Sequence, residues 1–243
     1  MIIFGSRMYG VKNVVHGFGL CPHCNQYAPH KSYNGRRWGH IYFIPIIPET
    51  KPLRVLKECS RCNTGSHIEE QQIPTLHQQL HAELQACIAA AQQCGRTDFD
   101  HPEGGEPLAI ARYLADAIEM LDAAGFGHEI EPLLDQLDQE PTRFEHSVAA
   151  AAHAEVRGDP RAALELLNTA ADVRPDAPYP PYALAGLHHR IGDPSTAVLY
   201  YQQACDLTED DPQILLEMTG PLEQLERYEE VIAFVDRVLK EGT

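Results

Sequence analysis

The sequence has little of several features that would announce a function. It contains one tryptophan, and its 19 lysines and arginines are outnumbered by 35 aspartates and glutamates among 243 residues. No apolar run approaches the roughly 20 residues that a membrane-spanning helix needs. Residues 1–5 form too short an apolar run for a signal peptide. From these absences we expect a cytoplasmic protein without a membrane span.

Motifs of known catalytic sites are also missing. We find no nucleophile turn of the G-x-S-x-G type, no nucleotide-binding glycine loop and no histidine paired with a nucleophile at a familiar spacing. His77 and His81 stand four positions apart, a spacing that can bind a metal, but Gln78 occupies the place of the glutamate in an HExxH motif. We interpret the two histidines as part of a solvated helix face and expect a protein that is not an enzyme.

Basic charge is concentrated at the N-terminal end of the chain. The segment 1–70 carries nine basic and four acidic side chains, whereas the rest of the chain carries ten basic and 31 acidic ones. Arg36 and Arg37 are the only adjacent basic pair, and no basic stripe follows a helix, so the electrostatic footprint of tight nucleic-acid binding is thin. Binding through these two arginines, Lys31 and Lys57 remains the alternative function. Attraction between the two halves, or ordinary solvated surface, would also account for the asymmetry.

Cysteine, in contrast, is present in a distinctive pattern. Cys21 and Cys24 form one C-x-x-C pair, and Cys59 and Cys62 form a second. Two such turns can direct four sulfurs at one ion, and they predict a closed tetrahedral site for one structural Zn²⁺. Four protein ligands leave no position for a catalytic water. The alternative is two disulfides in a secreted domain, but the three remaining cysteines form an odd set that suits a reducing compartment.

The stretch between the cysteine pairs, positions 25–58, is long enough to hold an inserted β-hairpin. Five histidines in or near it compete as ligands (His16, His23, His30, His40 and His67), although the four-cysteine set is complete without them. The apolar run from Ile41 to Pro48 has the length of a strand, and Pro45 and Pro48 favour an edge strand. Both of its faces are apolar. We expect one face to cover the sparse core and the other to pack on the helical domain, a partner or a second copy.

The same residues carry a resemblance. The segment 1–66 is similar to a family of small zinc-ribbon proteins of largely unassigned function, which combine two cysteine turns with an R-x-W-x-x-x-F-x-I-P-x-I-P-like segment. This chain supplies Arg36-Arg37-Trp38, then Phe43-Ile44-Pro45-Ile46-Ile47-Pro48, between its two cysteine pairs. The resemblance implies a fold and a metal but little about activity.

From about position 74 the hydrophobic period becomes helical. We expect a helix over residues 74–95, a linker over 98–106 and a helix over 107–122. An internal repeat follows, because Gly158-Asp159-Pro160 recurs as Gly192-Asp193-Pro194 and the same shift of 34 relates small and apolar positions downstream. A third copy begins at Glu226, and the segment after Gly125 indicates a further degenerate unit.

This shift matches the period of tetratricopeptide repeats, in which each unit is a pair of antiparallel helices. The chain resembles that family over about positions 143–241, with departures at Pro181 and Glu209. The resemblance implies a groove that binds a peptide or a helix. We expect the first helices to line that groove with a small, aromatic and weakly basic set, namely Glu145, Ala149, Ala152, Tyr179, Tyr182, Gly186 and His189, with Arg190 nearby.

These patterns predict an α+β protein, in which an N-terminal β-rich zinc ribbon precedes an all-α, tetratricopeptide-like solenoid of helical hairpins. We assign residues 1–70 to the ribbon, 71–106 to a connecting helix and linker, 107–142 to a degenerate helical hairpin and 143–243 to the repeats. The expected function is a non-catalytic protein–protein interaction scaffold or adaptor. Its partner would bind in the groove, on the apolar strand or on both, and self-association is left open. The alternative is a nucleic-acid-binding zinc ribbon whose repeats recruit a partner.

Overall fold

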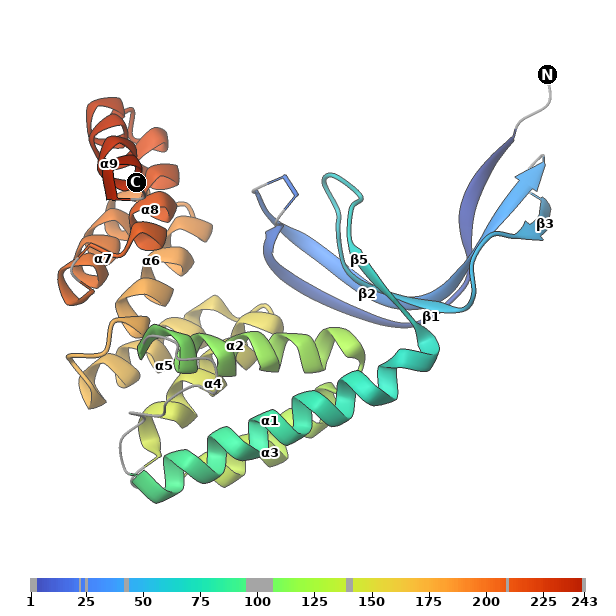
Figure 1. The fold of residues 1–243 in the computed structure, drawn as a ribbon, viewed down its shortest axis with the longest axis horizontal. Coiled ribbons are helices and arrows are strands. Elements are labelled where there is room, and N and C mark those ends of the chain that lie inside the picture. Colours follow the sequence, from blue (N-terminus) through green and yellow to red (C-terminus); the bar gives the residue numbers. More distant parts are fainter. Residues whose placement is uncertain are drawn as a thin grey trace. The chain divides into compact units, whose positions relative to one another are not determined.

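The fold is α+β, as predicted, with a β-sheet followed by helices (Figure 1). A computed structural model describes residues 4–21, 23–24, 26–41, 44–94, 107–138, 142–208 and 210–241. The expected linker at 98–106, Phe43 and Glu209 lie outside these ranges. The chain forms two compact units, which are taken separately below. The first comprises Met1–Ala89, Asp116–Gln136 and Glu155–Gly158, and the second comprises the remaining segments.

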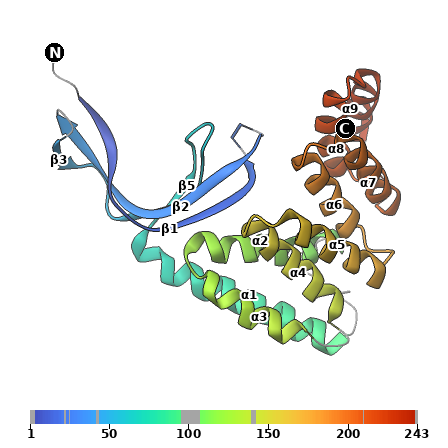
Figure 2. The same ribbon diagram turned by 180° about the vertical axis from the view of Figure 1, so that it is seen from behind.

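The sheet of the first unit is antiparallel and has β2 at its centre. Its described strands are β1 (Phe4–Cys21), β2 (Gln26–Ile41), β3 (Ile44–Pro48), β4 (Leu53–Cys59) and β5 (Ser66–Glu69). The order is β1-β2-β4-β5, and β3 pairs with the far end of β2. The β1–β2 ribbon is long and curved, which Figure 1 and Figure 2 show from opposite sides. The hairpin expected between the cysteine pairs is formed by β2 and β3, which pair antiparallel.

The β3 strand lies at an edge of the sheet, as its prolines predict. It pairs with β2 from Trp38↔Pro48 to Ile41↔Ile44, and the register shifts between Gly39 and His40. The side chain of Ile44 is 65% exposed and that of Ile47 is 64% exposed. The expectation that one face of this strand covers the core is not met at Ile44 or at Ile47, which strict alternation would place on opposite faces. The register shift interrupts that alternation.

A buried arginine fastens the sheet to a helix end within the first unit. Arg54, on β4, is 2% exposed. Its Nε donates to the Ala123 carbonyl (2.6 Å), in the last turn of α2 (Pro107–Ala124), and its Nη1 donates to Asn34 Oδ1 (2.6 Å). The last carbonyls of a helix lack partners within the helix and carry partial negative charge. Arg54 therefore satisfies one of them and ties β2, β4 and α2 together.

Two further helices complete the description of the first unit. The helix α1 (Ile73–Cys94) follows the 3₁₀ turn η1 (Glu70–Gln72), and α3 (Ile130–Leu137) follows the 3₁₀ turn η2 (Gly127–Glu129). Figure 1 and Figure 2 both show α3 beside α1. Leu84 and Ile88 of α1, together with Ile130 of α3, are fully or almost fully buried.

The repeats follow as successive helices, of which α5 to α9 pack on one another in order. They are α4 (Arg143–Val156), α5 (Pro160–Val173), α6 (Tyr179–Arg190), α7 (Pro194–Leu207), α8 (Pro212–Gln224) and α9 (Tyr228–Glu241). The shift that relates the two Gly-Asp-Pro turns also relates the first and the last residues of α5, α7 and α9. The expected period is thus present in the helix boundaries. Among the described residues, no helix combines the length and the apolar character needed to cross a bilayer.

Equivalent aspartates cap the N-termini of α5 and α7. Asp159 accepts a hydrogen bond from the Ala162 amide, and Asp193 accepts one from the Thr196 amide, each at 3.1 Å. Such side chains cap unpaired amides at the first turn of a helix. Gly158 (φ +75°) and Gly192 (φ +86°) precede them in the left-handed region, which glycine enters at little cost. The two glycines thus stand in the turns that connect α4 to α5 and α6 to α7.

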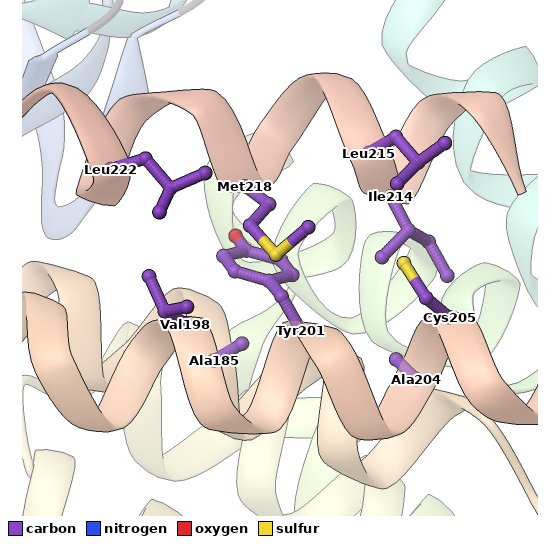
Figure 3. Close-up of a cluster of buried hydrophobic side chains, with 9 residues drawn as sticks. All are labelled: Ala185, Val198, Tyr201, Ala204, Cys205, Ile214, Leu215, Met218 and Leu222. Carbon is purple, nitrogen blue, oxygen red and sulfur yellow. The ribbon is translucent and has the colours of Figure 1, made fainter. Parts of the chain in front are cut away.

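Small residues let the helices of the second unit approach closely. Ala163, Ala170, Ala197 and Ala204 are all fully buried, at the positions that the repeat predicts. Figure 3 shows an apolar cluster around α7 and α8, where Ile214, Leu215, Met218 and Leu222 of α8 face Val198, Tyr201, Ala204 and Cys205 of α7, with Ala185 of α6. This cluster forms an apolar core shared by α6, α7 and α8, against which Val231 and Phe234 of α9 also pack.

Candidate metal centre

Strand pairing brings the two cysteine turns to one end of the sheet. Cys21 ends β1 and pairs with Gln26 at the start of β2, while Cys59 ends β4 and pairs with His30 of β2. Cys24 and Cys62 follow in the turns after these two strand ends. Because β2 lies between β1 and β4, both turns lie at the same end of the sheet, near the start of β2.

The second turn depends on two unusual backbone positions. Asn63 adopts the left-handed conformation (φ +54°), and its amide donates to the Cys59 carbonyl (2.9 Å). Gly65, by contrast, is not a left-handed residue. A Cβ there would lie 2.8 Å from the Glu58 Cα and 2.9 Å from the Leu56 carbonyl oxygen. A side chain at Gly65 would therefore push the returning chain away from β4 and open the turn.

The four sulfurs gather at a spacing that suits one ion. They all lie within 4.8 Å of one another, with 3.6 Å between Cys21 and Cys62 and 3.9 Å between Cys24 and Cys59. A Zn–S bond of about 2.3 Å places the sulfurs of a regular tetrahedron about 3.8 Å apart. A disulfide would need about 2.05 Å, and all four cysteines are free thiols. The arrangement thus fits a tetrahedral S₄ metal site.

Backbone groups in the second turn favour the thiolate form. Hydrogen bonds from the amides of Cys62 and Arg61 lower the pKa of Cys59, and the Arg61 nitrogen lies 3.4 Å from its sulfur. Hydrogen bonds from the Thr64 side chain and backbone lower the pKa of Cys62 to about 6. The thiolate is the form that binds metals. This turn is therefore electrostatically prepared for a cation.

The sulfur cluster is also enclosed. Cys21 and Cys59 are buried with Ala28, while Cys24 and Cys62 are partly buried against them. Within the described ranges, none of the five competing histidines joins the four sulfurs. Four sulfur ligands around one ion would leave no open coordination position.

The basic side chains proposed for nucleic acid are largely engaged within the chain. Lys31 pairs with Glu58 at 3.1 Å, and Lys57 pairs with Glu119. The Arg36 Nε donates to the Thr50 carbonyl at 2.6 Å. These contacts neutralise or occupy three of the four cations named for that function, so the structure adds no support to it.

The expected groove residues of the repeats are mostly covered. Glu145, Ala149, Ala152 and Tyr179 are all buried. The Glu145 carboxylate, 2% exposed, accepts an ion-pair contact from Arg174 at 2.8 Å. The prediction that these four residues line an open groove is therefore wrong, because their side chains are buried.

The remaining groove residues are half-buried and also have partners in the second unit. The Tyr182 hydroxyl donates to Glu217 (2.8 Å), and a ring nitrogen of His189 shares a hydrogen bond with Gln224 (2.8 Å). Burial lowers the pKa of His189, which keeps the imidazole neutral near pH 7. These polar groups join α6 to α8.

The structure also brings together a cluster of two histidines and a glutamate that the sequence patterns did not predict. The carboxylate of Glu129 lies against His77 and His81, and the donor atoms of all three are within 4.8 Å of one another. The spacing of the two histidines was visible in the sequence. Their third member was not, because it comes from a separate segment after α2.

Comparisons with known proteins give little beyond this description. No family model matches the sequence, and no curated protein matches it. Solved structures of MamA are similar: the match to MamA 41-end from Desulfovibrio magneticus RS-1 covers 70% of this chain and 93% of that chain, with 13% identity and a TM-score of 0.43. The match to MamA AMB-1 covers 72% and 95%, with 17% identity and a TM-score of 0.44. At such identities and TM-scores we transfer nothing from MamA to this chain.

Proposed function

We propose that this protein is a non-catalytic protein–protein interaction scaffold whose N-terminal ribbon is held by one structural Zn²⁺ on Cys21, Cys24, Cys59 and Cys62. The observation that carries the proposal is the tetrahedral spacing of the four sulfurs. Residues 1–70 form the zinc ribbon, 71–106 a connecting segment, 107–142 a degenerate hairpin and 143–243 tetratricopeptide-like repeats. The free thiols support a reducing, cytoplasmic location.

The zinc replaces a hydrophobic core that the ribbon lacks. Among the described residues of the sheet, the buried apolar side chains besides the cysteines and Ala28 are Tyr33, Leu53, Val55 and Leu56, and Met8 packs against the first three. So few apolar side chains stabilise a small β-domain poorly, and a structural metal supplies folding free energy directly. The ion thus serves to present a surface, and it takes no part in a reaction.

The surface with the best support as a partner site is the β3 edge. Ile44 and Ile47 expose most of their side chains, and an edge strand offers unpaired backbone groups to another chain. The repeats offer less, since four of the residues expected in their groove are buried. We therefore assign the main partner contact to the ribbon and a supporting contact to the repeats.

Metal analysis tests the zinc part of the proposal. Purified wild-type protein is expected to hold zinc on the ribbon, and Cys59→Ser is expected to lose it. Cys87→Ser is the matched control, because Cys87 is a free thiol of α1 outside the sulfur cluster. Equal metal content in the Cys59 variant and the wild type would refute the assignment.

Partner capture tests the scaffold part. Wild-type protein, Ile44→Asp and Leu199→Asp are compared as baits, since Leu199 of α7 is equally exposed at 65%. We expect Ile44→Asp to lose the partner but keep its zinc. Leu199→Asp should keep both its zinc and most of the bound partner. Recovery that neither substitution changes would reject the β3 edge as the docking surface.

A further inference from the structure

The first unit contains a second cluster of side chains that can bind a metal, and its ligand atoms are nitrogen and oxygen, not sulfur. His77 and His81 stand one turn apart on α1, so their side chains project from the same side of the helix. Glu129 ends the 3₁₀ turn η2 and points its carboxylate at them. His77, His81 and Glu129 are named the histidine–glutamate cluster below.

The contacts inside the cluster are short. The Nε2 atom of His77 lies 2.8 Å and 3.0 Å from the two carboxylate oxygens of Glu129, and the Nδ1 atom of His81 lies 3.8 Å from Oε2. Metal–nitrogen and metal–oxygen bonds of about 2.0–2.2 Å place tetrahedral ligands about 3.3–3.6 Å apart. The two distances to Oε2 straddle this range, so shifts of about half an ångström would admit an ion.

The surroundings hold two of the three ligands in position. The Phe126 ring stacks on the His77 ring, with centroids 4.0 Å apart and planes at 25°. The Glu129 amide donates to the Phe126 carbonyl (2.9 Å), which sets the turn that delivers the carboxylate. The side chains of His77 and Glu129 are 27% and 26% exposed, and that of His81 is 47% exposed. The cluster is thus ordered on one side and open to solvent on the other, as an ion-exchanging site requires.

We propose that the histidine–glutamate cluster binds a divalent transition-metal ion, with Zn²⁺ as the fitting example. Two imidazoles and one carboxylate are borderline ligands suited to such ions, and three protein ligands leave a coordination position for water. The site differs from the S₄ centre, which is closed. An ion here would clamp the start of α1 to the turn before α3. The proposal does not rest on the scaffold function.

The competing explanation is a His–Glu hydrogen bond with no metal. Glu129→Gln separates the two, because the amide keeps a hydrogen-bonding oxygen but is a poor ligand for Zn²⁺. His81→Ala removes a half-exposed ligand at little risk to folding. His67→Ala is the matched control, since His67 is an exposed histidine of β5 outside the cluster.

The experiment measures Co²⁺ and Zn²⁺ binding to the full-length protein. Cobalt in a thiolate site gives an intense sulfur-to-metal charge-transfer band, whereas cobalt on nitrogen and oxygen ligands gives only weak d–d bands. We expect wild-type protein and His67→Ala to bind a second equivalent with the weak bands alone. Glu129→Gln and His81→Ala should bind that second equivalent at least about tenfold more weakly, because even outer-shell changes cost about 10–100-fold.

A thermal unfolding series supplies the independent readout. With the first equivalent of Zn²⁺ already bound, excess Zn²⁺ should raise the Tm of the wild type and of His67→Ala, but not that of Glu129→Gln. Saturation of the wild type at one equivalent would overturn the proposal. A second equivalent that binds Glu129→Gln and His81→Ala as tightly as the wild type would also overturn it.

Discussion

The sheet of the first unit and the repeats of the second have interiors of different composition. The cluster around α7 and α8 consists of two leucines, two alanines, an isoleucine, a valine, a cysteine, a tyrosine and a methionine (Figure 3). The sheet buries cysteines, a few apolar side chains and the charged Arg54. Hydrophobic burial is non-directional and tolerates gradual loss, whereas a metal site or a buried ion needs every partner. The sheet should therefore lose its structure abruptly, and the repeats gradually.

Loss of the proposed ribbon zinc is expected to have the largest effect on this difference between the sheet and the repeats. Structural zinc contributes on the order of 10 kcal/mol to small domains, so Cys59→Ser or a chelator should unfold the sheet. Because Arg54 joins β4 to the last turn of α2, that turn should lose protection too. Hydrogen exchange by mass spectrometry is expected to show exposed amides in β1–β5 while α6–α8 stay protected. Sheet amides that stay protected in metal-free protein would contradict this expectation.

Removal of the buried arginine comes next. Arg54→Ala leaves the Ala123 carbonyl and the Asn34 side chain without their donor and opens a cavity, at a cost of roughly 3–5 kcal/mol. Burial raises the pKa of Asp122, and the positive charges of Arg54 and Lys57 lower it. Removal of Arg54 should therefore raise the pKa of Asp122 further. Urea unfolding followed by tryptophan fluorescence measures the loss, since the single tryptophan, Trp38, lies in the sheet.

The control for Arg54→Ala is Lys51→Ala. The Lys51 side chain is 66% exposed and makes a surface ion pair with Glu69. Such pairs contribute about 0–1 kcal/mol. Equal effects of the two substitutions would show that Arg54 does not hold the sheet to α2.

A cavity in the repeats should produce a smaller and more local effect. Leu215 of α8 is 1% exposed, and its neighbour Leu216 is 48% exposed. Leu215→Ala is expected to cost about 2–5 kcal/mol, and Leu216→Ala well under half of that. Hydrogen exchange in α7 and α8, read beside zinc content, tests whether the loss stays in the second unit. Zinc release by Leu215→Ala would show that the stabilities of the two units are coupled and would contradict the expected local effect.

The sequence predicted the features that repeat or that lie close together along the chain. Two C-x-x-C turns, the inserted hairpin, the edge strand with its prolines and the period of the repeats all follow from local spacing. Contacts between distant segments were not predictable in this way. Arg54 bonds to a carbonyl 69 residues away, and Glu129 meets His77 across 52 residues. The groove prediction failed for Glu145 for the same reason, because its partner Arg174 is the C-cap residue of the next helix, α5.

The smallest expected effect concerns the third copy of the repeat turn. Glu226 occupies the place of Gly158 and Gly192 and adopts φ +59°, although it carries a side chain. The left-handed conformation costs a non-glycine residue about 1–2 kcal/mol. Glycine removes this cost, but it also raises the conformational entropy of the unfolded chain, which offsets part of the stabilisation. Glu226→Gly should therefore stabilise the α8–α9 turn by about 0.5–1 kcal/mol. The reverse change, Gly192→Ala, should destabilise the α6–α7 turn by a similar amount or more. Hydrogen exchange of α9 against α7 measures both, and a destabilised Glu226→Gly would mean that the exposed glutamate contributes a contact the repeat pattern does not predict.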